Sequence, residues 1–123
     1  RILAGRLKSL GCRVTVSARK ASDFALISAM GCYAAKTSEI KKHLNCDIIF
    51  NTVDVKVIED GDFEDCTAEL IMDLSSRGGY DSAAAEAAGI TALKAPGLPG
   101  KTAPQTAGEI LARSVREIIT TTI

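Results

Sequence analysis

Short apolar runs that alternate with helical segments are the feature that most constrains how this chain can fold. The runs that predict strands are residues 12–18, 32–35, 47–53, 68–74 and 90–93. Helical spacing of apolar residues predicts helices over residues 2–10 and 22–30. Residues 38–44 are predicted as a short polar helix and 81–88 as an alanine-rich helix, whereas residues 55–64 suit a short helix or a turn. This alternation favours an α/β fold of βαβ units around a parallel sheet, and 123 residues suffice for one domain.

Residues 95–108 form the most rigid connection of the chain, because they hold all three of its prolines and three of its ten glycines. We expect Thr102 to cap the helix that follows, with Gln105 completing a capping box. That helix is expected to bury Ala107, Ile110, Leu111, Val115 and Ile118. Such a turn fixes where backbone amides point, so it suits a ligand site as well as it suits a simple connection.

Charge and hydropathy exclude several classes of function. Lysine plus arginine and aspartate plus glutamate number fifteen each, so no net field attracts nucleic acid or an anionic membrane surface. The sequence has no signal peptide and no run of eighteen apolar residues. We therefore expect a soluble, cytoplasmic protein without a membrane span, in which any anion binding is local.

The cysteines and the single histidine do not form a recognisable metal or catalytic motif. Cys12, Cys32, Cys46 and Cys66 lack the spacing of two to four residues that zinc sites use, and we predict no metal site. They are expected to act as small buried hydrophobes in a reducing compartment. His43 lies near the end of a short polar helix, where compensation of the helix dipole is a better interpretation than catalysis.

Polar and glycine-rich segments follow four of the predicted strands. These segments are residues 17–20, 51–52, 75–79 and 95–100. In a parallel α/β sheet the ligand crevice lies outside the carboxyl ends of the strands, whereas the cysteines of this chain stand at the opposite ends. The sequence therefore predicts one binding edge formed by these four segments.

The end of the first predicted strand bears on the choice of coenzyme. In dinucleotide folds an acidic residue at this place holds the ribose hydroxyls, whereas an arginine accommodates a 2′-phosphate. This chain has Arg19 followed by Lys20, and Ser17 and Ser22 supply hydroxyls. Because guanidinium pairs well with phosphate, NADP(H) is favoured over NAD(H) if a dinucleotide binds. The alternative is a solvated basic loop.

Two long segments resemble those of a known enzyme family. Residues 73–81 read Asp-Leu-Ser-Ser-Arg-Gly-Gly-Tyr-Asp, and residues 95–108 read Ala-Pro-Gly-Leu-Pro-Gly-Lys-Thr-Ala-Pro-Gln-Thr-Ala-Gly. Together with Ser-Ala-Arg at 17–19 and Asn-Thr at 51–52, this pattern covers nearly the whole chain and resembles the C-terminal half of the dipicolinate synthase A subunit. One departure is an Arg-Gly-Gly turn one residue shorter than the Arg-Pro-Gly-Gly form of the family, which leaves the placement of Arg77 open.

The resemblance implies a Rossmann-like, NADP-dependent oxidoreductase that makes dipicolinate from a dihydrodipicolinate-type intermediate of the lysine pathway. It implies the cytoplasm of the mother cell of a sporulating bacterium, a flavoprotein-like partner, the dipicolinate synthase B subunit, and a separate N-terminal domain. Residues 1–123 would then be a partial NAD(P)-binding domain without its first strand and glycine-rich loop. That strand would lie between the strands at 12–18 and 47–53, so a fragment of only these residues is predicted to aggregate through open strand edges.

Under this hypothesis the segments at 17–20 and 51–52 bind the coenzyme. Ser17, Arg19 and Lys20 would hold the phosphate end of the adenosine. Asn51 and Thr52 would border the nicotinamide ribose.

The later strand ends would lie at the reacting end of the site. Pro96, Gly97 and Leu98 would form a wall and backbone contacts near the nicotinamide. Arg77 is a candidate partner for a carboxylate of the dicarboxylate substrate or for the coenzyme, because a planar cation pairs with carboxylate, with a surface arginine at a turn as the alternative. The sequence identifies no catalytic acid or base, and it leaves open whether the protein is a homo-oligomer.

Two other functions remain open at this point. Residues 76–81 also resemble the arginine-glycine segment of D-2-hydroxyacid dehydrogenases, but their acid/base histidine should follow the last strand, where Pro-Gly-Leu-Pro-Gly stands instead, far from His43. A non-catalytic dinucleotide-binding regulatory module is the second alternative, because no obvious general base lies at the predicted strand ends.

Overall fold

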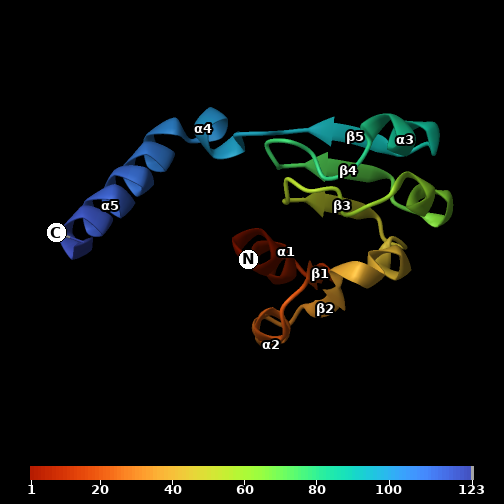
Figure 1. Cartoon of the computed structure of the whole chain (residues 1–123), viewed down its shortest axis with the longest axis horizontal. Helices are drawn as coiled ribbons and strands as arrows, with labels where there is room; N and C mark the ends of the chain where they lie inside the picture. The colour runs from red at the N-terminus through yellow and green to blue at the C-terminus, as the bar shows by residue number, and fades with distance from the viewer. Residues whose placement is uncertain (123) are drawn as a thin grey trace.

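The computed structural model describes residues 1–122, with side chains at all of these positions except 118 and 122. Helices and strands alternate along the chain, as the sequence predicts (Figure 1). The helices are α1 (Ile2–Ser9), α2 (Ala21–Ala29), α3 (Ser82–Ala87), α4 (Leu98–Thr102) and α5 (Pro104–Thr122), with 3-10 helices η1 (Thr37–His43) and η2 (Asp60–Asp65). The strands are β1 (Thr15–Ala18), β2 (Tyr33–Lys36), β3 (Ile48–Asn51), β4 (Leu70–Asp73) and β5 (Thr91–Lys94).

The strands form two parallel sheets. β1 pairs with β2, and a second sheet has the order β3-β4-β5. Figure 1 shows the smaller sheet beyond the β3 edge of the larger one. Within residues 1–122 no strand pairs β1 with β3. The predicted parallel α/β fold is confirmed, and the division into two sheets agrees with the expectation that the sheet lacks a strand between them.

Each strand is four residues long, which is shorter than most of the predicted runs. The run at 12–18 shows why. Gly11 turns the chain with φ of 88°, and the amide of Cys12 still donates to the carbonyl of Leu7, 3.1 Å away, at the end of α1. Cys12 therefore belongs to the helix end, and the strand begins only at Thr15. The ambiguous stretch at 55–64 contains the start of η2.

The hydrophobic core belongs to the larger sheet. Ile71, within β4, has no exposed surface, because it lies on the buried face of that strand within a cluster of apolar side chains. The buried residues packed with it are Leu44, Ile58, Phe63, Ala85 and Ile90. The ring of Phe63 meets that of Tyr80 edge to face, with centroids 6.2 Å apart. This core holds β3, β4 and β5 in register and so fixes the positions of their carboxyl ends.

The C-terminal helix differs from the prediction in two ways. Thr102 does not cap it, because this residue ends α4 and its hydroxyl donates to the carbonyl of Leu98, 2.8 Å away. Gln105 donates to Glu109, 3.4 Å away, instead of completing a capping box.

The expected burial of this helix is also wrong. Ile110, Leu111 and Val115 are 57%, 66% and 53% exposed, because α5 extends away from both sheets (Figure 1). The side chain of Ile118 lies outside the described residues. No helix within residues 1–122 is both long and apolar enough to cross a lipid bilayer.

Candidate functional site

Three buried polar side chains join the carboxyl ends of β3 and β4. Asn51 and Asp73 stand opposite each other in the register, and the Asn51 amide donates to the Asp73 carboxylate over 2.8 Å. Ser75 donates to the same carboxylate oxygen from its hydroxyl, 2.6 Å away, and from its backbone amide, 3.0 Å away. The three residues are 5%, 2% and 8% exposed in this order. We call Asn51, Asp73 and Ser75 the polar triad.

The polar triad holds its carboxylate in the ionised form. Burial acts to raise the pKa of Asp73, but the hydrogen bonds from Ser75 and Asn51 outweigh it and hold this pKa below the ordinary value. The positive charge of Lys94 acts in the same direction. Asp73 is therefore a fixed anion that organises the strand ends, and its acceptor oxygen is occupied by these donors.

Hydrogen bonds and a close approach to β3 hold the glycine turn at residues 75–79, which follows β4. The carboxylate of Asp54 accepts hydrogen bonds from the amides of Ser76 and Arg77, at 2.7 and 2.9 Å. The carbonyl of Gly79 accepts from the amide of Val57, 2.9 Å away. A Cβ at Gly79 would come within 2.6 Å of the Asn51 side-chain oxygen, so the turn approaches β3 too closely for any larger residue.

A cavity of about 400 Å³ lies among α1, β1, α2 and the segment that follows β3. Its wall is apolar and comes from α2 and from the segment after β3, and includes Leu26, Ile27, Val53, Val55 and Val57. Its remaining lining includes Ser17, Arg19 and Lys20, which follow or end β1. The lining also includes Arg1 and Asp23, which form an ion pair with each other at 3.2 Å. The carboxyl end of β1 and the segment after β3 therefore border one cavity that combines an apolar wall with Arg19, Lys20 and this ion pair.

Cys32 also lines this cavity, whereas Cys46, Cys66 and the histidine lie elsewhere. Cys46 and Cys66 precede β3 and β4, and both thiols donate to the carbonyl of Leu44, at 3.9 and 3.4 Å. Burial raises the pKa of the Cys46 thiol, and the neighbouring Cys66 adds to this effect. His43 is exposed at the end of η1, before β3. None of these groups follows the carboxyl end of a strand.

Comparison with known proteins gives a clear relative. No family model matches the chain. Over 120 residues the chain is 41% identical to the A subunit of dipicolinate synthase from Bacillus subtilis strain 168. The predicted resemblance to the dipicolinate synthase A subunit is confirmed. This match covers 95% of the chain and 40% of the relative, so the chain spans about two-fifths of the relative's length.

Two crystal structures of the dipicolinate synthase A subunit have the same fold. The A chain from Bacillus subtilis superposes with a TM-score of 0.87 at 40% identity and covers 98% of this chain and 41% of its own. The A subunit from Bacillus halodurans gives a TM-score of 0.85 at 35% identity, covering 94% of this chain and 41% of its own. The arrangement of helices and strands described above is therefore shared with solved structures of that enzyme.

The residues predicted from the resemblance to dipicolinate synthase are only partly brought together. Ser17, Arg19 and Lys20 line the cavity, whereas Ser22 and Thr52 are exposed and are not part of its lining. Their coenzyme roles stay predictions.

The other predicted residues stand apart from the cavity lining. The amide of Asn51 is engaged in the polar triad and also donates to the carbonyl of Val53, 3.0 Å away. Arg77 is exposed, with its backbone amide held by Asp54. Pro96, Gly97 and Leu98 follow β5, which neighbours β4.

The polar triad is the part of the site that sequence reasoning missed. Asp73 belongs to the motif at 73–81, but the sequence alone predicts no role for it. The sequence does contain a signal that predicts this contact. Asn51 and Asp73 each end an apolar run, and the ends of two such runs become neighbours when the strands are parallel and adjacent. Ser75, two residues after Asp73, supplies the short polar side chain that can reach back to it.

Proposed function

We propose that residues 1–123 form the coenzyme-binding part of an NADP-dependent oxidoreductase that resembles the dipicolinate synthase A subunit. The observation that carries this proposal is the pair of cations, Arg19 and Lys20, on the lining of an apolar cavity at the end of β1. An adenosine moiety needs an apolar wall and a 2′-phosphate needs cationic donors, so this donor set fits NADP(H). NAD(H) is the weaker candidate, because Arg19 and Lys20 directly follow β1, and the acid on the cavity lining, Asp23, lies in α2 and pairs with Arg1.

The proposed reaction is the oxidation of a dihydrodipicolinate-type intermediate to dipicolinate. Such a substrate loses a hydride and a proton, and the aromatic ring that results supplies the driving force. NADP⁺, when bound, accepts the hydride. Arg77 can pair with a substrate carboxylate, and Pro96, Gly97 and Leu98 can shape the wall near the reacting carbon.

Asn51 and Thr52 border the ribose in this proposal, although the Asn51 amide group is engaged within the polar triad. That residue therefore positions the neighbouring backbone. Its side-chain oxygen accepts a long hydrogen bond of 3.5 Å from the amide of Val53 and faces Gly79 at close range. Ser22 supplies a further hydroxyl at the start of α2.

The resemblance to the A subunit also supports a proposal about partners and location. We propose that the longer protein works with the dipicolinate synthase B subunit on a small dicarboxylate in the cytoplasm of the mother cell during sporulation. A homo-oligomer is compatible with this proposal.

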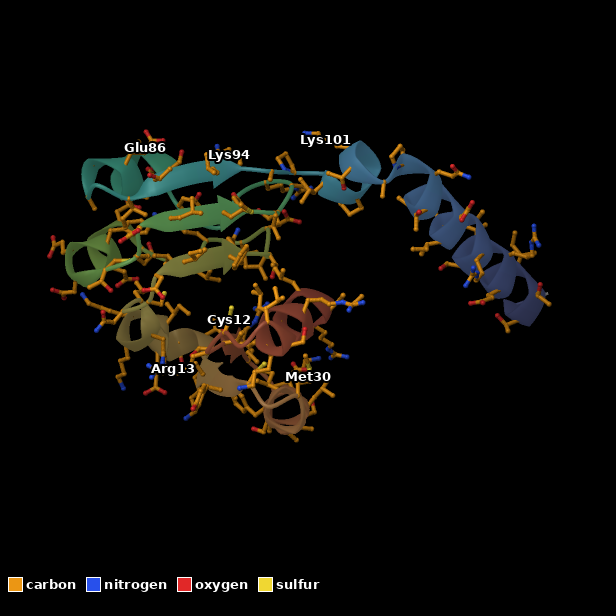
Figure 2. All side chains as sticks on the ribbon, turned by 180° about the vertical axis from the view of Figure 1, so that it is seen from behind. Cys12, Arg13, Met30, Glu86, Lys94 and Lys101 are labelled. Carbon is orange, nitrogen blue, oxygen red and sulfur yellow. The ribbon has the colours of Figure 1, made fainter. Side chains whose placement is uncertain are left out.

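Exchanging Arg19 for aspartate in the full-length protein tests the coenzyme assignment. We expect Arg19→Asp to shift the ratio of kcat/KM values from NADP⁺ toward NAD⁺ by more than about tenfold, because a charge-assisted hydrogen bond to phosphate contributes about 1.5–3 kcal/mol. Arg13→Asp is the matched control, since Arg13 is exposed and precedes β1 (Figure 2). An unchanged ratio in Arg19→Asp would contradict the assignment.

A non-catalytic regulatory module is the second candidate. It is favoured by one observation, namely that the buried carboxylate at the strand ends, Asp73, is engaged by donors from Asn51 and Ser75 and is not free to take up a proton. Assaying the full-length protein together with its partner for NADPH formation and dipicolinate absorbance separates the two functions. Coenzyme binding without turnover would favour the module.

A further inference from the structure

The glycine turn has four successive backbone amides, those of residues 75–78, that donate to side chains. The polar triad holds the first and the last of them, through Asp73 at 3.0 Å and through the hydroxyl of Ser75 at 3.0 Å. The two amides between them both donate to one carboxylate oxygen of Asp54, at 2.7 and 2.9 Å. Because a turn has no strand ladder or helix to fix its backbone, these acceptors set its conformation.

Asp54 differs from the other acceptors of the turn in burial and in origin. Asp73 and Ser75 are buried where the ends of β3 and β4 meet. Asp54 is exposed and belongs to the segment that follows β3. In the described part of the chain its carboxylate forms no ion pair and accepts from the amides of Ser76 and Arg77. Its effect is therefore local to the backbone of these two residues.

Arg77 combines a fixed backbone with an unpaired guanidinium. Asp54 holds its amide, whereas no group among the residues that the structure describes forms an ion pair or a hydrogen bond with its side chain. Arg77 is exposed and follows β4, at the edge where parallel α/β sheets bind their ligands. A guanidinium presents its donors in a planar fork that matches a carboxylate, so this one is available to an external anion.

We propose that Asp54 is a positioning residue, which fixes the backbone of Arg77 and so presents its guanidinium to a carboxylate of the substrate. This role rests on the proposed function, in which Arg77 pairs with a small dicarboxylate. Asp54 contacts backbone amides and not the ligand, so it acts only through Arg77. Without its carboxylate the turn samples more conformations in the free protein, and ordering Arg77 on binding costs conformational entropy. Affinity for the dicarboxylate then falls, although every contact to the ligand can still form.

Binding of dipicolinate to the full-length protein, measured by titration calorimetry, tests this role. We expect Asp54→Ala to raise the Kd by about threefold to tenfold, the entropic cost of ordering one long side chain. Arg77→Ala should raise it by about tenfold to a hundredfold, because the charge-assisted hydrogen bonds to the carboxylate are lost.

Two further single variants separate the position of the acceptor oxygen from its charge. Asp54→Asn keeps an oxygen where one oxygen of Asp54 accepts from both amides, so its Kd should stay within about twofold of the wild type. Asp65→Ala is the matched control, since it removes an exposed carboxylate whose ion pair with Lys41 is long, at 3.9 Å, and should leave the Kd within about twofold.

The double variant Asp54→Ala, Arg77→Ala shows whether Asp54 acts through Arg77. We expect its Kd to equal that of Arg77→Ala, since a positioning residue has no effect once the side chain that it positions is gone. Circular dichroism checks the folding of each variant. If Asp54→Ala does not fold, Asp54→Glu gives the same comparison with Asp54→Asn, because it keeps the charge but moves the oxygens away from the two amides.

Three results would overturn this role, and they differ in what they leave standing. A wild-type Kd in Asp54→Ala together with a raised Kd in Arg77→Ala removes the role of Asp54 and leaves the proposed role of Arg77 intact. Losses that add in the double variant mean that Asp54 acts independently of Arg77. A Kd that Arg77→Ala leaves unchanged shows instead that the proposed substrate contact is wrong, and the role of Asp54 fails with it.

Discussion

At the scale of single residues, Asp73 shows how burial and hydrogen bonding together set a charge. Its pKa lies below the ordinary value, so the ionised carboxylate stabilises the folded state. This stabilisation is complete above the unfolded pKa of about 3.9 and is lost as the pH falls through the lower folded pKa. We expect Asp73→Asn in the full-length protein to reduce the free energy of unfolding at pH 7 by about 1–3 kcal/mol and to flatten the acid side of its pH dependence. Urea unfolding at pH 7 and under acid conditions measures both effects. Asp60→Asn, at an exposed ion pair with Lys56, is the control and should change little. If the free energy of unfolding of Asp73→Asn still falls as steeply in acid as that of the wild type, other carboxylates cause the fall.

At the scale of elements, the residue that caps the N-terminus of a short helix contributes much of its stability. α3 has six residues, and the Asp81 side chain accepts hydrogen bonds from the amides of Ala83 and Ala84, at 2.8 and 3.3 Å. We expect Asp81→Ala to lower the free energy of unfolding of the full-length protein by about 1 kcal/mol, because these first-turn amides lose their acceptor. Asp81→Asn keeps an acceptor oxygen and should cost only a few tenths of that. Urea unfolding of the two variants side by side measures the difference, and equal losses would mean that the carboxylate acts in some other way. α5 shows the reverse case, since Thr102 is predicted as its cap and instead lies within α4.

At the scale of the whole molecule, β1 and β3 each pair with a strand on one side only within residues 1–122, so each leaves an open edge. Unpaired edges present rows of free amides and carbonyls, which pair readily with other chains. We expect a purified fragment of residues 1–123 to self-associate as its concentration rises and to bind NADP(H) weakly, whereas the full-length protein should not associate through these edges. Light scattering over a dilution series, with coenzyme titrations on the same samples, measures both properties. A monodisperse monomeric fragment with tight NADPH binding would show that the open edges have no such effect.

The sequence by itself determined the alternation of strands and helices, the parallel fold class and the resemblance to dipicolinate synthase, because these depend on local periodicity and on motifs that are contiguous along the chain. It also indicated which segments follow the strands. Only the tertiary structure decided that Asn51 meets Asp73 and Ser75, since strand register brings together the ends of β3 and β4, more than twenty positions apart in the chain. Likewise, an amphipathic pattern predicts that α5 has an apolar face but not where that face goes. The same amphipathic pattern would arise whether Ile110, Leu111 and Val115 packed on the sheet or, as here, stayed exposed on a helix that extends away from it.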